Sequence, residues 1–163
     1  MTVVLASVAF WAPFSLTLPG DDGKPELIEG RARFKRLKTS ESSALARRMR
    51  ANNLLPEVRK AIRKDLDDPK ANFRDKERET IEADLEADPI SDAEFLRDIL
   101  VDWDLKDTRG EPIAYTPATR DELCEDWDGL EAALVRGYLK AREVAANPKA
   151  VEKNSGGPSA TTS

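Results

Sequence analysis

Two groups of carboxylates lie close together in one stretch of the sequence, ILVDWDLKDTRGEPIAYTPATRDELCEDW, residues 99–127. The first group comprises Asp102, Asp104 and Asp107, and the second follows further along the chain (Asp121, Glu122, Glu125 and Asp126). Clustered carboxylates could hold a divalent metal ion or act as an acid–base pair, which would suit metal-assisted hydrolysis. Such clusters also arise without a function in this chain, because 31 of its 163 residues are acidic.

Other features of a catalytic centre are missing from the sequence. It has no calcium-binding loop pattern, no P-loop and no Gly-x-Gly-x-x-Gly motif. The chain contains no histidine and a single cysteine, Cys124, which excludes a disulfide framework and zinc sites with Cys/His spacing. Without a histidine to deprotonate it, this cysteine is better explained as a small apolar side chain in a reducing compartment. We therefore expect no enzymatic activity, no catalytic residue, no cofactor and no metal ion.

A connector between two helices explains residues 99–127 more fully than a catalytic loop does. Residues 107–110 predict a turn, and residues 112–115 predict an extended segment. Thr116 followed by Pro117 is typical of a helix N-cap with proline in the first turn. In this interpretation, the Trp and Tyr side chains of the connector hold the two helices together.

The N-terminal region predicts an antiparallel hairpin. Phe14, Leu16 and Leu18 alternate with polar residues, the run ends in a turn at 19–23, and a second alternating run follows over residues 28–35. An isolated hairpin is marginally stable in water. We therefore expect both a third strand from residues 3–10 and helices packed across the apolar face.

The first eighteen residues, MTVVLASVAFWAPFSLTL, contain no charged side chain. A signal peptide would require a basic start and an unbroken apolar core, and here Trp11 and Pro13 interrupt the run. The run is also too short for a membrane-spanning helix. We therefore expect a strand at this place, a cytoplasmic protein and no membrane partner.

Residues 39–147 are predicted to be mostly helical. Ser40 is a candidate N-cap for a first helix, and Pro56 either bends the following helical piece or restarts it as a second helix. Ser91 with Glu94 predicts a capping box, and the helix that it opens carries a single apolar stripe. The members of this stripe are Phe95, Leu96, Ile99, Leu100 and Trp103.

The C-terminal part of this region predicts two further helices. Thr116 opens a short one, and Asp128 is a candidate N-cap for the last one. Gly137 in the last helix suggests the close approach of another helix, since glycine costs about 1 kcal/mol of helix propensity relative to alanine.

Together these patterns predict an α+β fold, in which an N-terminal antiparallel β-hairpin or small sheet is followed by a mostly helical body and a flexible C-terminal tail. The hairpin region covers residues 1–38 and the helical region residues 39–147, of which the charged segment 67–89 is partly mobile. The tail, residues 148–163, has too few large side chains to offset the entropy of ordering. The chain length suits one domain overall.

Charges are segregated along the chain. Residues 31–64 contain twelve Lys or Arg and two acidic residues, whereas residues 65–131 contain eight Lys or Arg and 23 acidic residues. A basic segment could bind nucleic acid, but here an acidic segment of the same chain can neutralise it. We therefore favour a solvated helix face and expect no nucleic-acid partner. Head-to-tail self-association between basic and acidic surfaces is the alternative, and salt would weaken it.

Five segments, in this order, carry a family resemblance: FWAPFSLTLPG (10–20), ARFKRLKTSE (32–41), ILVDWDLKDTRGEPIAYTP (99–117), LEAALVRGYLKA (130–141) and EKNS (152–155). They resemble the tail assembly chaperones of long-tailed, lambda-like bacteriophages. Those proteins begin with a "FWAPV"-like strand, continue to a strand ending in "FRR" or "FKRL", and later show a "GEPIPFT" connector and a final helix. The chain departs from the pattern at Asp102 and Asp104, where glycines are usual, and residues 56–89 look like an insertion.

This resemblance implies a non-catalytic protein of the infected host cytoplasm. Such chaperones bind the long, aggregation-prone tape measure protein, keep it soluble and promote polymerisation of the tail tube protein around it. They are then absent from the mature virion. In many of these phages a frameshifted, longer form recruits the tail tube protein.

Aromatic side chains that the core does not need are the candidate client contacts, and four are considered: Trp11, Trp103, Tyr115 and Trp127. Aromatic residues are common both in binding hot spots and in cores, so the alternative is that all four are internal. Two other functions stay open. One is a structural minor component of the phage tail or connector, and the other is the metal-assisted hydrolase considered above.

Overall fold

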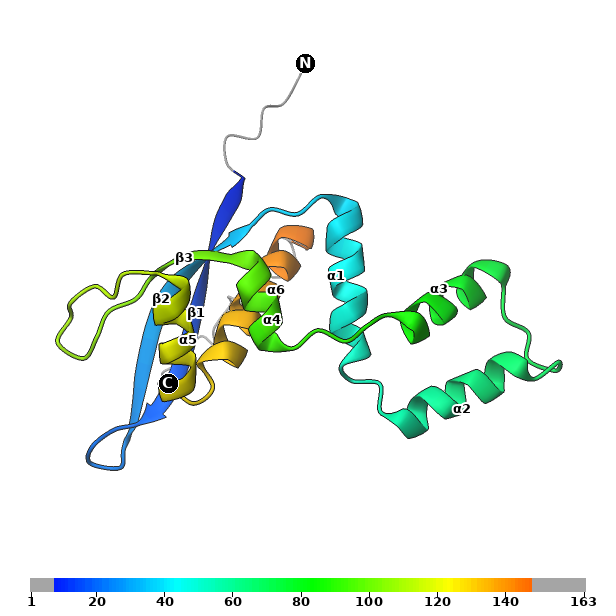
Figure 1. Cartoon of the computed structure of the whole chain (residues 1–163), viewed down its shortest axis with the longest axis horizontal. Helices are drawn as coiled ribbons and strands as arrows, with labels where there is room; N and C mark the ends of the chain where they lie inside the picture. The colour runs from blue at the N-terminus through cyan, green and yellow to red at the C-terminus, as the bar shows by residue number, and fades with distance from the viewer. Residues whose placement is uncertain (1–7, 148–163) are drawn as a thin grey trace, which may run out of the picture. The chain divides into compact units, whose positions relative to one another are not determined.

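The computed structural model describes residues 8–147, and these residues belong to two compact units (Figure 1). We call residues 8–35 together with 96–147 the sheet unit, and residues 36–95 the helical unit. The units divide the chain differently from the predicted regions, because the sheet unit combines the N-terminal strands with the last third of the described chain. The predicted tail and residues 1–7 lie outside the described residues, and the expectation of a single domain stays a prediction.

The sheet unit contains a three-stranded antiparallel sheet in the order β1-β2-β3. β1 (Ala9–Pro19) and β2 (Pro25–Lys35) form the predicted hairpin, with Pro19 opposite Pro25 at the turn. Alternate residues of β1 are buried, so one face of the hairpin is apolar and the other is exposed. The α+β fold class expected from the sequence is confirmed.

The third strand comes from a different place than the sequence predicts. It is β3 (Leu100–Asp104), which pairs with β2, whereas residues 9 and 10 belong to β1 and residues 3–7 lie outside the described part. α4 (Asp92–Ile99) begins at the predicted capping box, in which Ser91 and Glu94 exchange hydrogen bonds, but ends before Leu100. The expected helix through Trp103 is therefore wrong in its last turn.

A register shift in the β2–β3 pairing explains this error. Ala32 lies opposite Trp103 and Arg33 opposite Asp102, but Phe34 lies opposite Leu100, so one residue of β3 is left over. This bulge turns Leu100 and Trp103 toward the same buried face although they are three residues apart. Apolar residues three positions apart also form the stripe of an amphipathic helix. The sequence of this strand therefore predicts a helix.

α6 (Leu130–Ala146) packs against the buried face of β1 and β2. The ring of Tyr138 lies 5.2 Å from that of Phe34, edge-on, and 5.9 Å from that of Phe10. A Cβ atom on Gly137 would lie 2.8 Å from the carbonyl oxygen of Pro13. The predicted close approach at Gly137 therefore occurs, but the neighbour is a strand rather than a helix.

Two of the predicted helix N-caps lie in the part of the chain that leads to α6. Thr116 caps α5 (Pro117–Asp126) by accepting a hydrogen bond from the backbone N–H of Thr119, as predicted. The N-cap of α6 is Gly129, with φ of +84°, and not Asp128 as predicted. The left-handed conformation at this position favours glycine, which places the start of the helix one residue later.

The helical unit contains α1 (Thr39–Ala51), α2 (Pro56–Asp67) and α3 (Asp75–Glu86). Pro56 occupies the first turn of α2, as predicted. α1 begins at Thr39 after Lys38, whose N–H donates to the carboxylate of Glu41, so the prediction of Ser40 as the cap is wrong. The start of α1 is thus fixed by the Glu41 carboxylate, three residues after the cap, and not by the hydroxyl of Ser40.

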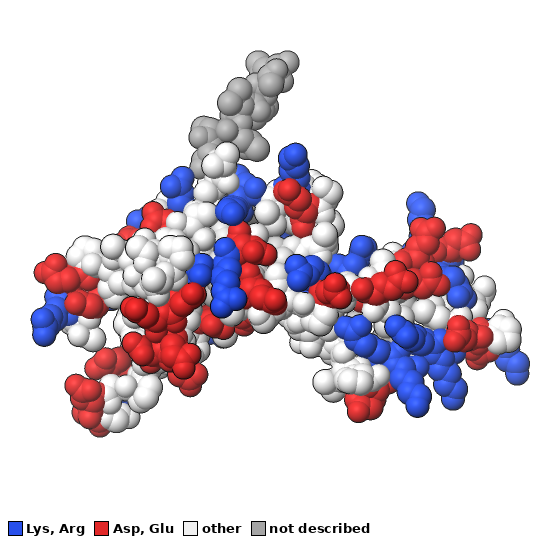
Figure 2. Space-filling view, viewed as in Figure 1, with Lys and Arg blue, Asp and Glu red and all other residues white. Residues whose placement is uncertain are grey.

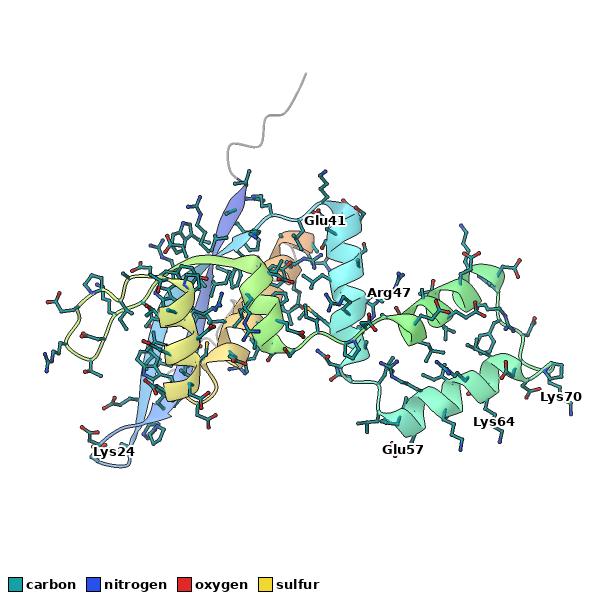
Figure 3. The ribbon with its side chains drawn as sticks, viewed as in Figure 1. Lys24, Glu41, Arg47, Glu57, Lys64 and Lys70 are labelled. Atoms are coloured by element: carbon teal, nitrogen blue, oxygen red, sulfur yellow. The ribbon has the colours of Figure 1, made fainter. Side chains whose placement is uncertain are left out.

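Arginine side chains join the three helices of this unit. Arg47 and Arg50 of α1 each donate to Oδ1 of Asp84 at 3.1 Å (Figure 3 shows Arg47). Arg59 donates to the backbone carbonyls of Ala51 and Leu85. The predicted neutralisation of basic residues by the acidic segment 65–98 therefore occurs at Asp84. Figure 2 shows the remaining charges of this unit, with basic side chains along α2 and acidic ones along α3.

A candidate binding surface on the sheet

Trp103 and Tyr115, two of the four candidate aromatic residues, are used within the sheet unit. Trp103 is buried, its indole Nε1–H donates to the carbonyl of Ile113 at 2.8 Å, and its ring meets that of Tyr115 edge-on at 5.0 Å. The Tyr115 hydroxyl donates to the carbonyl of Leu100. Their polar groups thus hold the connector against β3, and Trp103 is buried whereas Tyr115 is half-buried.

The turn of the connector lies where the sequence predicts it, but the connector joins β3 to α5 and not two helices as predicted. Asp107 Oδ1 accepts the backbone N–H groups of Arg109 and Glu111, and Gly110 in the same turn has φ of +83°. Trp127 follows α5 as its C-cap and is half-buried. Trp127 therefore presents a smaller fraction of its surface to a partner than Trp11 does.

Trp11 differs from the other three, because 41% of its surface is exposed. It lies on the face of the sheet opposite to the buried one, where its ring is 5.3 Å from the guanidinium carbon of Arg31 and 6.0 Å from that of Arg33. Guanidinium groups over an indole ring are favourable cation–π partners. Trp11 is therefore kept in place by two arginines rather than by the core.

We call this side of the sheet the open face, and it is made of alternate residues of the three strands: Trp11, Pro13, Ser15 and Thr17 of β1, Glu29, Arg31 and Arg33 of β2, and Asp102 and Asp104 of β3. The residues of β1 in this set are all exposed. Their charges are mixed, with two arginines and three carboxylates. Leu27 of β2, opposite Thr17, lies on this face as well, so Trp11 and Leu27 are its large apolar side chains.

Two neighbouring cross-strand pairs on the open face behave differently. Arg31 lies opposite Asp104, and the two form an ion pair at 2.9 Å. Arg33 lies opposite Asp102, but within the described residues it forms no ion pair, and its Nε, enclosed from solvent, has no hydrogen-bond acceptor. Asp102 instead accepts the backbone N–H of Trp103 at 2.8 Å. The guanidinium of Arg33 therefore keeps its hydrogen-bonding capacity.

The carboxylates that suggested chemistry in the sequence are not brought together. Asp102 accepts the backbone N–H of Trp103, and Asp104 forms an ion pair with Arg31. Asp107 accepts a backbone N–H group of the connector turn. Asp121 pairs with Arg120 at 2.9 Å. In residues 8–147 no three side chains among Asp, Glu, Cys and His gather in a way that could hold a metal ion.

One member of the second acidic group, Asp121, pairs with a buried arginine. Arg120 is only 6% exposed, and it contacts Asp121 and the hydroxyl of Tyr115. Burial alone would lower the pKa of Arg120, but the hydrogen bonds and charges of these two partners raise it. The hydrogen bond from Arg120 in turn lowers the pKa of Asp121. Arg120 therefore stays charged, as a structural ion pair requires.

Cys124 lies half-buried in α5, and burial, together with the charge of Glu131, raises its pKa to about 11. A nucleophilic cysteine needs a lowered pKa, because the thiolate is the reactive form. The thiol of Cys124 is therefore held in its unreactive state near neutral pH.

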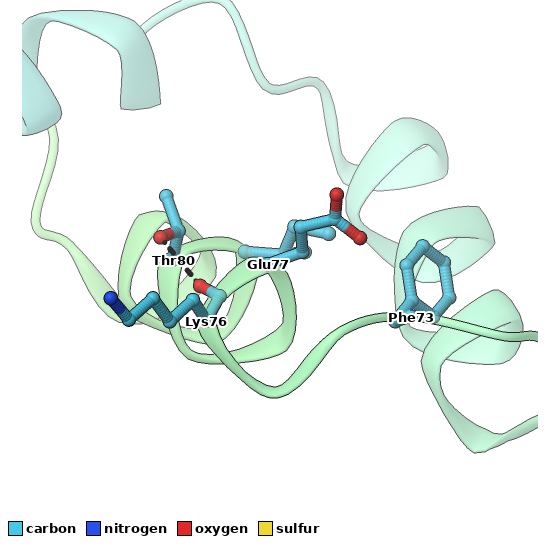
Figure 4. A pocket seen from close by; sticks show the side chains of 5 residues that line it. Phe73, Lys76, Glu77 and Thr80 are labelled. Carbon is cyan, nitrogen blue, oxygen red and sulfur yellow. Dashed lines mark hydrogen bonds between the residues drawn. The ribbon is translucent and has the colours of Figure 1, made fainter.

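The hollows of the described surface include one on each unit. Phe73, Lys76, Glu77, Thr80 and Ile81 line a wide-open hollow of about 430 Å³ on the helical unit (Figure 4). Thr80 donates its hydroxyl hydrogen bond to the carbonyl of Lys76, within its own helix. The exposed lining of the hollow is mainly apolar, so it offers little of the polar surface that a small-molecule site normally provides.

The second hollow, of about 390 Å³, lies in the sheet unit between β1 and α6 and is lined in part by Ser15, Arg136 and Lys140. It too holds no buried, unpaired polar side chain among the described residues. Neither hollow provides as specific an arrangement as Trp11 and Arg33 on the open face.

Comparison of this chain with protein families, with curated proteins and with solved structures finds no match. None of the helices in the described ranges is both long enough and apolar enough to cross a bilayer. The geometry of the sheet is therefore the basis of the functional argument.

Sequence reasoning identified Trp11 as a candidate but missed Arg33. The signal was present in the hairpin turn, because a turn over residues 20–24 fixes the register that places Trp11 opposite Arg33. That Arg33 would be left without an ion pair could not be predicted, since this depends on the bulge in β3.

Proposed function

We propose that this protein is a tail assembly chaperone of a long-tailed bacteriophage, which binds the tape measure protein in the host cytoplasm and keeps it soluble until tail tube subunits polymerise around it. The resemblance of the five ordered segments supports the proposal.

One observation carries the proposal. In the segment FWAPF, Ala12 and Phe14 face the core, whereas Trp11 is exposed on the open face. The fold uses the apolar side chains on both sides of Trp11 but leaves that ring in solvent. A tryptophan held at the surface is the residue type most enriched in binding hot spots.

Binding of a long client by many copies requires only modest contacts from each. A tape measure protein would present repeated apolar stripes along its helices, and each chaperone copy would cover one patch. Repeated weak contacts add up to strong overall binding through effective concentration. We therefore expect weak binding of a single copy to a short client segment, and stable complexes only with long segments.

Co-expression tests the proposal directly. The full chain is expressed with the large helix-rich protein encoded beside it in the phage genome, and the soluble fraction of that protein is measured. We expect more soluble client with the wild-type chain than without it, and a smaller gain with Trp11→Ser. Equal insolubility with and without the chain would contradict the proposal.

Composition of the purified phage particle provides an independent test. A chaperone leaves before the particle is complete, so mass spectrometry of virions should detect the tail tube and tape measure proteins but not this chain. Detection at a fixed stoichiometry in the virion would instead favour a structural minor tail component.

A further inference from the structure

We propose that Arg33 and Trp11 together form a contact site for an amphipathic helix of a client protein. Arg33 binds a carboxylate of that helix, and the ring of Trp11 receives an apolar side chain one turn away. The inference depends on the proposed function for the identity of the client, but the site itself follows from the open face.

The contrast between Arg31 and Arg33 is the first step. Both lie on β2 beside Trp11, and both have an aspartate opposite them on β3. Arg31 uses its guanidinium on Asp104 at 2.9 Å. Arg33 has no such partner among the described residues, and its enclosed Nε lacks an acceptor. A carboxylate from outside would bind the terminal nitrogens of this guanidinium, which have no hydrogen-bond partner among the described residues, and not the enclosed Nε.

A carboxylate fits this guanidinium better than a nucleic-acid backbone does. A guanidinium offers a planar fork of N–H donors, which matches the two oxygens of a carboxylate. A polyanion would also meet Glu29, Asp102 and Asp104, which share the open face. One carboxylate at Arg33 would meet Asp102 as its nearest like charge, whereas a row of phosphates would meet all three carboxylates.

The spacing and the place of the site favour a helix as the partner. The guanidinium carbon of Arg33 lies 6.0 Å from the centre of the Trp11 ring, and side chains three or four residues apart on a helix are separated by about 5–6 Å. The open face presents side chains rather than unpaired strand edges. A partner that docks there must satisfy its own backbone hydrogen bonds, which a helix does and a lone strand does not.

Substitution of the two arginines tests the site, with Arg31 as the matched control. The wild-type chain, Arg33→Gln and Arg31→Gln are titrated with a synthetic amphipathic peptide of about 21 residues that carries Glu and Leu four positions apart. The indole N–H signal of Trp11 is followed by NMR. We expect Arg33→Gln to weaken binding by about tenfold or more, because it removes charge-assisted hydrogen bonds. Arg31→Gln should weaken binding less than Arg33→Gln does, because the Arg31 guanidinium is already paired with Asp104 and its loss removes only a contact with the Trp11 ring.

Changing the peptide tests the same contact from the other side. Replacing its Glu residues by Gln should weaken binding to the wild-type chain about as much as Arg33→Gln does, and should have little further effect on the Arg33→Gln protein. Arg33→Lys should fall between wild type and Arg33→Gln, because a lysine keeps the charge but not the fork. Thermal unfolding of each variant separates loss of binding from loss of folding.

The outcomes distinguish this inference from the proposed function. If the Trp11 signal does not move with the peptide, or if Arg31→Gln and Arg33→Gln weaken binding equally, the site is wrong. The site is also wrong if single-stranded DNA moves the Trp11 signal at lower concentration than the peptide does. If the peptide binds as expected but the chain does not solubilise the tape measure protein, the proposed function fails and the site stands.

Discussion

The sheet unit and the helical unit are stabilised by different kinds of contact. In the sheet unit, the rings of Phe10, Phe34 and Tyr138 meet one another beneath the strands. In the helical unit, Arg59 donates to three backbone carbonyls, those of Ala51, Leu54 and Leu85. The last carbonyls of a helix have no partner within it, so a side chain that reaches them can fix one helix end against another.

This difference shows how a segment with few large apolar residues can still have a defined geometry. Apart from Arg59, Arg78 donates to the carbonyl of Leu66 at the end of α2, and Arg48 donates to that of Asp88. Arginine serves this purpose well because its guanidinium carries five donors in a rigid plane. We therefore expect the sheet unit to depend on apolar volume and the helical unit on arginine donors.

The largest expected effect is that of removing apolar volume from the sheet unit. Phe34 is fully buried, so Phe34→Ala should lower the free energy of unfolding by about 3–5 kcal/mol. Leu27 on the same strand is 63% exposed, so Leu27→Ala should change it by less than about 0.5 kcal/mol. Urea titration followed by circular dichroism measures both. A loss below about 1.5 kcal/mol for Phe34→Ala would contradict the role of the aromatic contacts.

The next effect is that of removing the arginine donors from the helical unit. Arg59→Met keeps much of the side-chain volume but leaves three carbonyls without this donor, so it should cost about 1.5–3 kcal/mol. Amide hydrogen exchange should show the loss of protection in α1, α2 and α3. Lys60→Met is the matched control, because Lys60 is an exposed neighbour on the same helix. Equal effects of the two substitutions would show that the contacts of Arg59 do not stabilise the unit.

Local patterns predicted much of the fold. The hairpin, the proline at the start of α2, the capping box at Ser91 and the N-cap at Thr116 all depend on residues within a few positions of one another. The local sequence is therefore enough to predict such features. The error at β3 has a different origin, because the strand depends on pairing with β2, far away in the sequence.

The candidate site was predicted only in part, for the same reason. The sequence named Trp11 as one of four equal candidates, but Trp103 is buried and the polar groups of Trp103 and Tyr115 are bonded within the sheet unit. Their positions follow from the bulge in β3 and from the connector that crosses it. The arginines of the helical unit were interpreted as a solvated face, since a sequence does not show which of them reach a helix end.

A smaller effect is expected from the ion pairs between α1 and α3. Asp84, with 27% of its side chain exposed, accepts from both Arg47 and Arg50. Asp84→Asn should therefore lower the free energy of unfolding by about 0.5–1 kcal/mol in 50 mM salt. In about 1 M salt, where screening acts within about 3 Å, the wild type and the variant should become nearly equal. A difference that does not shrink with salt would point to lost hydrogen bonds rather than to charge.

The smallest effect concerns Cys124, the single thiol of the chain, which reports on the sheet unit. Burial raises its pKa to about 11 from an ordinary value of 9.0. The folded protein thus keeps the thiol proton at a pH where the unfolded chain has lost it. This contribution to stability is complete below about pH 9 and is lost as the pH rises toward 11.

Alkylation by iodoacetamide measures this shift. Between pH 7 and 9 the folded chain should react about ten- to a hundredfold more slowly than the urea-unfolded chain, since less of the thiol is ionised and only part of this is offset by the greater nucleophilicity of a more basic thiolate. The rate of the folded chain should still be rising above pH 10. Cys124→Ala should remove the decline in stability that the thiol causes between pH 9 and 11. If the folded and unfolded chains react equally fast, α5 opens too readily for burial to control the thiol, and the sheet unit is less firmly packed than its aromatic contacts indicate.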